Sequence, residues 1–201
     1  MGYPSNRTSR RAPSLHKAYK EWLGLKTLQE VTSIIQKFNL PATIAGGFAY
    51  DGVRGQLTKT HGDLDICCLS IDVFDIYKAF EQMGFHLYEK SFHVTEARKR
   101  GLLKVDIFQW RTSIPGTAEF ASPTQLCRVP LEVFQGKQWV QLNGLEFEIP
   151  SNEQLKAILP FITCAASKEF VNQLPTRPSF SFRKSQRLES YTIQLANPSS
   201  A

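Results

Sequence analysis

The segment Ile44-Ala-Gly-Gly-Phe-Ala-Tyr-Asp51, with His61-Gly-Asp-Leu-Asp-Ile66 shortly after it, decides how the centre of this chain folds. The apolar run before Gly46-Gly47 predicts a strand, and the residues after the glycines predict a helical turn. A second apolar run at 64–69 predicts the next strand. The segment therefore predicts the order of strand, glycine turn, helix and strand.

Two carboxylates and a glycine turn form the chemically informative part of this segment. Asp63 and Asp65 project from the same side of a strand because successive side chains alternate between its faces. Neighbouring carboxylates repel unless a cation neutralises them, and oxygen ligands suit Mg²⁺ or Mn²⁺. Gly46 and Gly47 have no Cβ to block a phosphate, and backbone N–H groups at a helix start favour anions. The segment therefore predicts a metal and phosphate site.

A third acid is predicted further along the chain. The stretch Lys104-Val-Asp-Ile-Phe108 also alternates, so that Lys104 and Asp106 share one face of a strand. If this strand lies beside Asp63 and Asp65, Asp106 completes a cluster of three carboxylates. Phosphoryl transfer needs charge neutralisation and a base near the attacking hydroxyl. Asp106 is therefore expected to bind metal, to accept the hydroxyl proton, or both, and Lys104 is expected to contact phosphate.

Other polar residues near the glycine turn are candidates for contacts with a nucleotide. They are Asp51, Arg54, Lys59 and His61. Each also has an ordinary structural reading: Asp51 as a local cap or ion pair, His61 as a residue that orients the loop, and the two cations as solvated side chains. Cys67 shares the face of Asp65 and is expected to pack rather than to react.

The remaining sequence predicts helices and hairpins around this centre. Residues 15–39 have apolar positions at helical spacing, with Gly24 as an expected break, and 72–83 predict another helix. The predicted hairpins pair 93–97 with 102–110, and 139–142 with 145–149 around Asn143-Gly144. Ser151 and Gln154 form a capping box that begins a helix, which we expect to end near Leu159.

Size and charge suggest one domain with basic ends. A chain of 201 residues with 42% hydrophobic content is expected to form one core, at 14–174. Residues 1–13 and 175–201 are expected to be a basic flexible segment and a basic Ser/Pro-rich tail. Residues 1–20 carry +5 and 175–201 carry +3 of the formal +6, so 21–174 carry −2. The ends are consistent with RNA binding or with solvated segments.

The four cysteines and the hydropathy pattern exclude several classes. Cys67, Cys68, Cys127 and Cys164 have neither Cys-x-x-Cys spacing nor clustered histidines, which argues against structural zinc and a disulfide framework. No apolar run is long enough for a membrane span, and because residues 1–13 are polar and basic we expect no secretory signal. We expect reduced thiols, no membrane partner and a cytoplasmic protein.

The pattern as a whole resembles a known family. Gly46-Gly47, fifteen residues and Asp63-Leu-Asp65 resemble the signature of the lincosamide and aminoglycoside nucleotidyltransferases, within the DNA polymerase beta-like nucleotidyltransferase superfamily. Asp51, Gly55, Thr58 and His61, which lie between the two motifs, belong to the same resemblance. The similar region covers about residues 25–160 and ends with the second hairpin and the capped helix.

The resemblance implies an α/β (α+β) fold, with a mixed twisted sheet flanked by helices, and a magnesium-dependent reaction. A nucleoside monophosphate would pass from a nucleoside triphosphate, most simply ATP, to a hydroxyl of a small antibiotic-like acceptor, with release of pyrophosphate. It further implies that Asp63 and Asp65 bind metal, that Gly46 and Gly47 bind the donor phosphates and that Asp106 is the third acid.

Two alternatives stay open at this point. One is a nucleotidyltransferase that modifies tRNA or protein, which the basic ends favour. The other is a non-catalytic nucleotide-binding module, against which the three acids argue because an unused acidic cluster costs stability.

Overall fold

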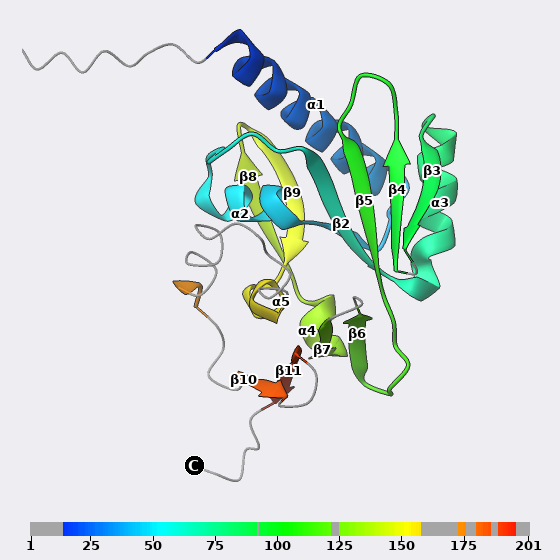
Figure 1. The fold of residues 1–201 in the computed structure, drawn as a ribbon, viewed down its shortest axis with the longest axis vertical. Coiled ribbons are helices and arrows are strands. Elements are labelled where there is room, and N and C mark those ends of the chain that lie inside the picture. The colour runs from blue at the N-terminus through cyan, green and yellow to red at the C-terminus, as the bar shows by residue number, and fades with distance from the viewer. Residues whose placement is uncertain are drawn as a thin grey trace, which may run out of the picture.

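The computed structural model describes residues 14–91, 93–121, 125–157, 173–175, 180–185 and 189–195 (Figure 1). The helices are α1 (Leu15–Lys37), α2 (Gly46–Arg54), the 3-10 turn η1 (Ser70–Asp72), α3 (Val73–Gln82), α4 (Leu131–Gln135) and α5 (Asn152–Ala157). The strands are β1 (Ala42–Ala45), β2 (Asp63–Leu69), β3 (His86–Ser91), β4 (Val94–Arg98), β5 (Lys104–Trp110), β6 (Thr117–Ala121), β7 (Gln125–Pro130), β8 (Lys137–Leu142), β9 (Leu145–Pro150), β10 (Phe180–Ser185) and β11 (Glu189–Leu195).

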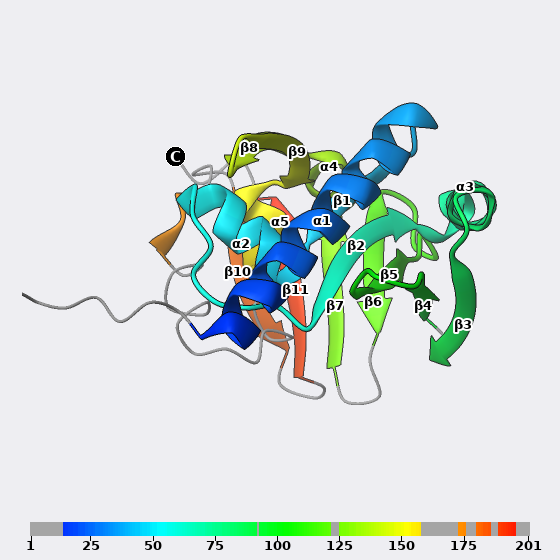
Figure 2. The same ribbon diagram turned by 90° about the horizontal axis from the view of Figure 1, so that it is seen from above.

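A mixed five-stranded sheet forms the centre of the molecule, in the order β1-β2-β5-β4-β3. β2 and β5 run parallel, whereas the other neighbouring pairs are antiparallel. Figure 2 shows α3 and β3 at one edge of this sheet and the β8–β9 hairpin toward the opposite side. The predicted α/β fold with a mixed sheet flanked by helices is confirmed. The parallel pairing of β2 with β5 brings together the two strands that carry the predicted acids.

The two faces of the central sheet belong to different hydrophobic cores. Leu64 and Ile66 of β2 point into a core that also contains buried residues of α1, α2 and α3. Cys67 of β2 and Trp110 of β5 point into a second core, built with β6, β7 and α4. Because side chains alternate along a strand, Asp65 lies on the same face as Cys67. Burial of Cys67 in this core confirms that it packs there.

The second sheet, in the order β10-β11-β7-β6, was not predicted from the sequence. Strand β11 joins β7 in parallel, although these strands are more than fifty residues apart in the chain. Residues 180–185 and 189–195 lie in the predicted basic Ser/Pro-rich tail, for which no strand was predicted, and they form β10 and β11. The segment 1–13 lies outside the described residues, and so does the predicted end of the capped helix beyond Ala157.

Helix α1 is continuous, so the predicted break at Gly24 is wrong. Gly24 is buried and faces Phe48 of α2. A Cβ at Gly24 would lie 3.1 Å from the Phe48 ring. The glycine allows close packing of two helices instead of ending the first one. Glycine inside a helix typically costs about 1 kcal/mol relative to alanine, and α1 is helical despite this cost.

The second hairpin and the helix cap form as the sequence predicts. Asn143 and Gly144 both have positive φ angles, 50° and 80°, as a two-residue turn between β8 and β9 requires. The Ser151 hydroxyl accepts the backbone N–H of Gln154 at the start of α5. Strand β9 contacts β1, which leads directly into the glycine turn. Across the described ranges, no helix is both long and apolar enough to cross a membrane.

Candidate active site

The glycine turn joins β1 to α2 and receives two side chains from the next strand and loop. Gly46 has a φ of 58°, and a Cβ there would lie 1.8 Å from Asp65 Oδ2. At Gly47 a Cβ would lie 2.4 Å from His61 Nδ1. Both glycines are therefore required because a carboxylate and an imidazole rest against the turn. The same closeness places Asp65 beside the N-terminus of α2, where backbone N–H groups favour anions.

The predicted acids lie on two adjacent strands. In the parallel pair β2–β5, Asp65 is the register partner of Asp106, and Asp63 is the partner of Lys104. All four side chains point to the same face of the sheet. Asp106 is buried, with 5% of its side chain exposed, whereas Asp63 is 43% exposed. The structure thus brings Asp63, Asp65, Asp106 and Lys104 together, next to Gly46.

A fourth carboxylate, Glu96 of β4, belongs to the same group and was missed in the sequence. It is the register partner of Asp106 on the other side, so that Asp65, Asp106 and Glu96 form a row across three strands. Only 9% of its side chain is exposed. The sequence prediction placed the turn at 98–101, but β5 begins at Lys104, and the shifted register is what aligns Glu96 with Asp106. The Leu103 N–H bonds instead to Thr27 of α1, which keeps 103 out of the sheet.

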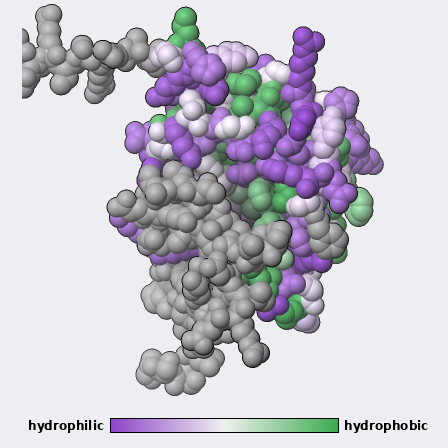
Figure 3. Space-filling model, viewed as in Figure 1, coloured by the Kyte–Doolittle hydropathy of each residue, from purple (hydrophilic) through white to green (hydrophobic). Residues whose placement is uncertain are grey.

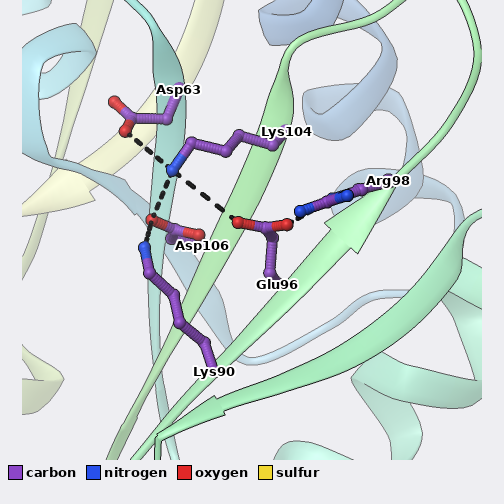
Figure 4. A network of polar contacts seen from close by, with 6 residues as sticks. All are labelled: Asp63, Lys90, Glu96, Arg98, Lys104 and Asp106. Carbon is purple, nitrogen blue, oxygen red and sulfur yellow. Dashed lines mark hydrogen bonds and ion pairs between the residues drawn. The ribbon is translucent and has the colours of Figure 1, made fainter.

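Three cations lie among these acids (Figure 4). Lys104 Nζ is 3.3 Å from Asp63 Oδ2, 3.4 Å from Asp106 Oδ2 and 3.7 Å from Glu96 Oε2. Lys90 Nζ of β3 approaches Asp106 Oδ2 to 2.6 Å. Arg98 donates through Nε to Glu96 Oε1. Figure 3 shows hydrophilic side chains over this part of the sheet, with hydrophobic side chains below them.

The cations leave part of the negative charge without compensation. Burial, reinforced by Asp63 and then Asp106, raises the pKa of Asp65 to about 7, although Lys104 and Lys90 oppose the rise. Asp106 Oδ1 is buried and accepts no hydrogen bond from the described residues. Burial by itself would lower the pKa of Lys104, but Asp106 and Asp63 outweigh burial and raise it. The site therefore attracts further positive charge.

The chemistry of the carboxylates on this face of the sheet, Asp63, Asp65 and Asp106, is compatible with a hard divalent cation. Carboxylate oxygens are the ligands that Mg²⁺ and Mn²⁺ prefer, and Asp106 Oδ1 is a buried acceptor in need of a partner. Among the described residues, no three His, Cys, Asp or Glu side chains are grouped closely enough to hold one metal ion. Lys104 and Lys90 lie between the acids instead.

Asp51 and His61 form a buried pair that supports the turn. His61 Nε2 lies 2.6 Å from Asp51 Oδ2, and the exposed fractions of the two side chains are 5% and 1%. The Thr58 N–H and hydroxyl both donate to Asp51 Oδ1. Both carboxylate oxygens of Asp51 are thus used to fix the loop 55–62. His61 reaches the glycine turn with its other ring nitrogen, so Asp51 acts on the turn through His61.

Two predicted cations lie further from the turn. Arg54 is the last residue of α2, about 12 Å along the helix axis from Gly46 at its start. Lys59 is exposed in the loop 55–62. The contacts of Lys90 with Asp106 and of Arg98 with Glu96 were not predicted. The sequence indicated only that side chains alternate along the strands that carry them. Phe108 lies two residues after Asp106 on the same face of β5. Its ring contacts Phe120 and packs against the second hydrophobic core.

Comparison with known proteins identifies the family. Residues 27–159 match the sequence profile of the family described as aminoglycoside-2''-adenylyltransferase. A search of curated proteins gives no significant match. Among solved structures, the lincomycin-bound lincosamide antibiotic adenylyltransferase LnuA aligns with a TM-score of 0.55 and 12% identity, covering 75% of this chain and 97% of that one.

Two structures of the aminoglycoside resistance factor ANT(2'')-Ia are also similar. Its solution structure aligns with a TM-score of 0.50 and 19% identity over 76% of each chain. Its crystal structure with adenylyl-2''-tobramycin aligns with a TM-score of 0.50 and 18% identity, over 75% of this chain and 78% of that one. At these identities the alignments show a shared fold. The family match covers most of the chain, and this protein is accordingly a nucleotidyltransferase that belongs to the aminoglycoside-2''-adenylyltransferase family.

Proposed function

We propose that this protein transfers a nucleoside monophosphate from a nucleoside triphosphate to a hydroxyl of a small antibiotic-like acceptor and releases pyrophosphate. The proposed donor is ATP, so that the transferred group is AMP. One observation carries the proposal: the register of β2 and β5 pairs Asp65 with Asp106 beside the Gly46 turn. The name of the matched family supports an adenylyl donor and an aminoglycoside acceptor. Structures with a lincosamide and an adenylylated aminoglycoside share the fold.

The donor phosphates are proposed to lie at the start of α2. The N–H groups there have no partner within the first helical turn, and Gly46 and Gly47 leave the backbone accessible. His61 packs against Gly47 and holds the turn in place. Lys104 lies on the adjacent strand and supplies positive charge for the triphosphate. These groups fix the donor without taking part in bond changes.

The acceptor hydroxyl is proposed to lose its proton to Asp106. Its oxygen forms the new bond to the α-phosphorus, the bond from that phosphorus to the bridging oxygen breaks, and pyrophosphate leaves with the bond electrons. Asp106 Oδ2 is held by Lys90, and Oδ1 has no partner among the described residues, so one oxygen is available for the proton. A positioned base of this kind typically contributes 10² to 10⁴ in rate.

Mg²⁺ or Mn²⁺, held by Asp63, Asp65 and Asp106, would supply charge neutralisation for the triphosphate and the leaving pyrophosphate. Asp106 Oδ2, which faces the ammonium groups of Lys90 and Lys104, and the raised pKa of Asp65 support this ligand set, and Oδ1 is left for the proton. The carboxylates themselves keep the acceptor hydroxyl and the donor in one place.

Incubation with α-labelled ATP and Mg²⁺ tests the proposal. The acceptors are tobramycin, lincomycin, bulk tRNA and a cell lysate, and the products are separated by chromatography. We expect label on an aminoglycoside or a lincosamide. Asp106→Asn should reduce it by about 10² to 10⁴, while Glu132→Gln, at an exposed acid on α4, should not change it. Absence of label from every small acceptor would contradict the proposal.

Label on tRNA or protein would instead support a macromolecular acceptor. The two basic ends were the argument for that reading, and at the C-terminal end Arg183 and Lys184 belong to β10 of the second sheet. Binding to RNA through exposed cations weakens steeply with salt, whereas small-molecule turnover changes little. Labelling at two salt concentrations therefore separates the two acceptor classes.

A further inference from the structure

Glu96 is a buried acid that the proposed reaction does not use. It lies on β4 with 7% exposure, one strand beyond Asp106. A buried carboxylate is costly unless cations and hydrogen bonds compensate it. Glu96 Oε1 is held by Arg98, whose guanidinium also stacks on Tyr88 with 5.0 Å between the guanidinium carbon and the ring centroid. Oε2 is left facing Lys104 (Figure 4).

Lys104 lies where the acids would have to accept a divalent cation. Its ammonium group is within 3.5 Å of Asp63 and Asp106 and slightly further, 3.7 Å, from Glu96. A metal ion and an ammonium group repel each other at such distances. Binding of a cation to Asp63 and Asp106 therefore requires that the lysine leaves them. With 34% of its side chain exposed, Lys104 is still partly buried and needs a new anionic partner.

We propose that Glu96 is that partner, a positioning residue that takes Lys104 from Asp63 and Asp106 when these carboxylates bind a divalent cation. This inference rests on the proposed function, because it assumes that Asp63 and Asp106 are metal ligands. The lysine moves a short way along the row of acids and stays at the edge of the site. Its charge then no longer competes with the metal ion for Asp63 and Asp106.

Lys90 provides the contrast. It also contacts Asp106, at 2.6 Å, but its side chain is 46% exposed and it comes from β3 at the edge of the sheet. When a cation binds, Lys90 can turn into solvent without a protein partner. Glu96 should therefore matter for the displacement of Lys104 and not for that of Lys90.

Titration of the full-length protein with Mn²⁺ alone, measured by calorimetry, tests this role without turnover. In Glu96→Gln, Lys104 loses its alternative partner and stays on Asp63 and Asp106, so the Kd for Mn²⁺ should rise roughly fivefold or more. In Lys104→Met, the competitor is gone, and Mn²⁺ should bind more tightly than to the unchanged protein. In the double variant Glu96→Gln/Lys104→Met, the effect of Glu96→Gln should disappear.

The matched control is the same substitution in a Lys90→Met background, where the full effect of Glu96→Gln should remain. If Glu96→Gln weakens Mn²⁺ binding equally with and without Lys104, Glu96 acts as a ligand or through its charge alone, and the inference is overturned. An unchanged Kd in Glu96→Gln also overturns it. Lack of Mn²⁺ binding to the unchanged protein is a different result, which removes the metal site of the proposed function together with this inference. Thermal unfolding of each variant confirms that it is folded.

Discussion

Asp65 on β2 and Asp106 on β5 are direct register partners in the one parallel strand pair of the five-stranded sheet. This pairing joins acids that are forty-one positions apart in the sequence and places them next to Gly46. Everything proposed for the site depends on the convergence of these two carboxylates from separate strands.

Substitution of these acids should remove activity and leave the fold intact. We expect Asp65→Asn and Asp106→Asn to reduce labelling of the acceptor by about 10² to 10⁴. Asp65 is repelled by Asp63 and Asp106, so Asp65→Asn should keep or raise the thermal midpoint of the metal-free protein. Labelling assays and thermal unfolding in EDTA measure the two effects. Full activity in the double variant would contradict the assignment.

The stability of the metal-free protein should depend on pH through Asp65. Its folded-state pKa of about 7 lies above the ordinary value of 3.8, so the folded protein binds this proton more tightly than the unfolded chain. The associated stability is complete below about pH 4 and is lost as pH rises through 7, by up to about 4 kcal/mol.

Urea unfolding in EDTA at pH 5 and pH 8 measures this loss. Asp65→Asn cannot titrate and should remove most of the difference between the two pH values. Asp75→Asn, on the exposed side of α3, is the matched control and should keep the difference. A native-like pH dependence in Asp65→Asn would show that other groups cause it.

The sequence predicted the local parts of this site well because they follow from short-range patterns. The alternation of residues in 63–66 and in 104–108 correctly predicted that the acids share one face of each strand. Asn143-Gly144 correctly predicted the turn of a hairpin. Glu96 was not predicted as part of the site because its position depends on the register of β4 against β5. A prediction with the turn at 98–101 aligns Glu96 with Leu103, whereas the strand actually aligns it with Asp106.

Long-range pairing was also beyond the sequence patterns. Strand β11 pairs with β7, although α4, the β8–β9 hairpin, α5 and β10 lie between them in the chain. The Ser and Arg content of β10 and β11 resembles that of solvated tails, so composition favoured the wrong interpretation. Gly24 shows the same limit: glycine commonly weakens a helix, but contact with Phe48 decides its role here.

The glycine turn should not tolerate a side chain at Gly46. Alanine there would place its Cβ on the Asp65 carboxylate and would also adopt a φ of 58°, which is strained for any residue with a Cβ. Gly46→Ala should therefore displace Asp65, destabilise the protein by about 1–3 kcal/mol and abolish labelling. Gly62→Ala, where no atom lies within 4 Å of the added Cβ, should be close to neutral. Activity assays and urea unfolding compare the two variants.

The pair of Asp51 and His61 should be a source of stability rather than of direct chemistry. Asp51 is almost fully buried and uses both oxygens, one for His61 and one for Thr58. Removal of one partner of a buried pair leaves the other uncompensated, which typically costs about 3–5 kcal/mol. Asp51→Ala should therefore lower the free energy of unfolding by about that amount and loosen the loop 55–62.

Thr58→Val offers the graded comparison, because it removes the hydroxyl donor and keeps the backbone N–H bond to Asp51. Its cost should be about 1 kcal/mol, the usual contribution of one hydrogen bond. Hydrogen exchange of the loop amides reports whether the loop opens in each variant. Since His61 holds the turn at Gly47, the order of loop protection should match the order of activity: unchanged protein, then Thr58→Val, then Asp51→Ala. If Asp51→Ala kept the loop protected and lost activity alone, Asp51 would have to contact the donor or the acceptor directly.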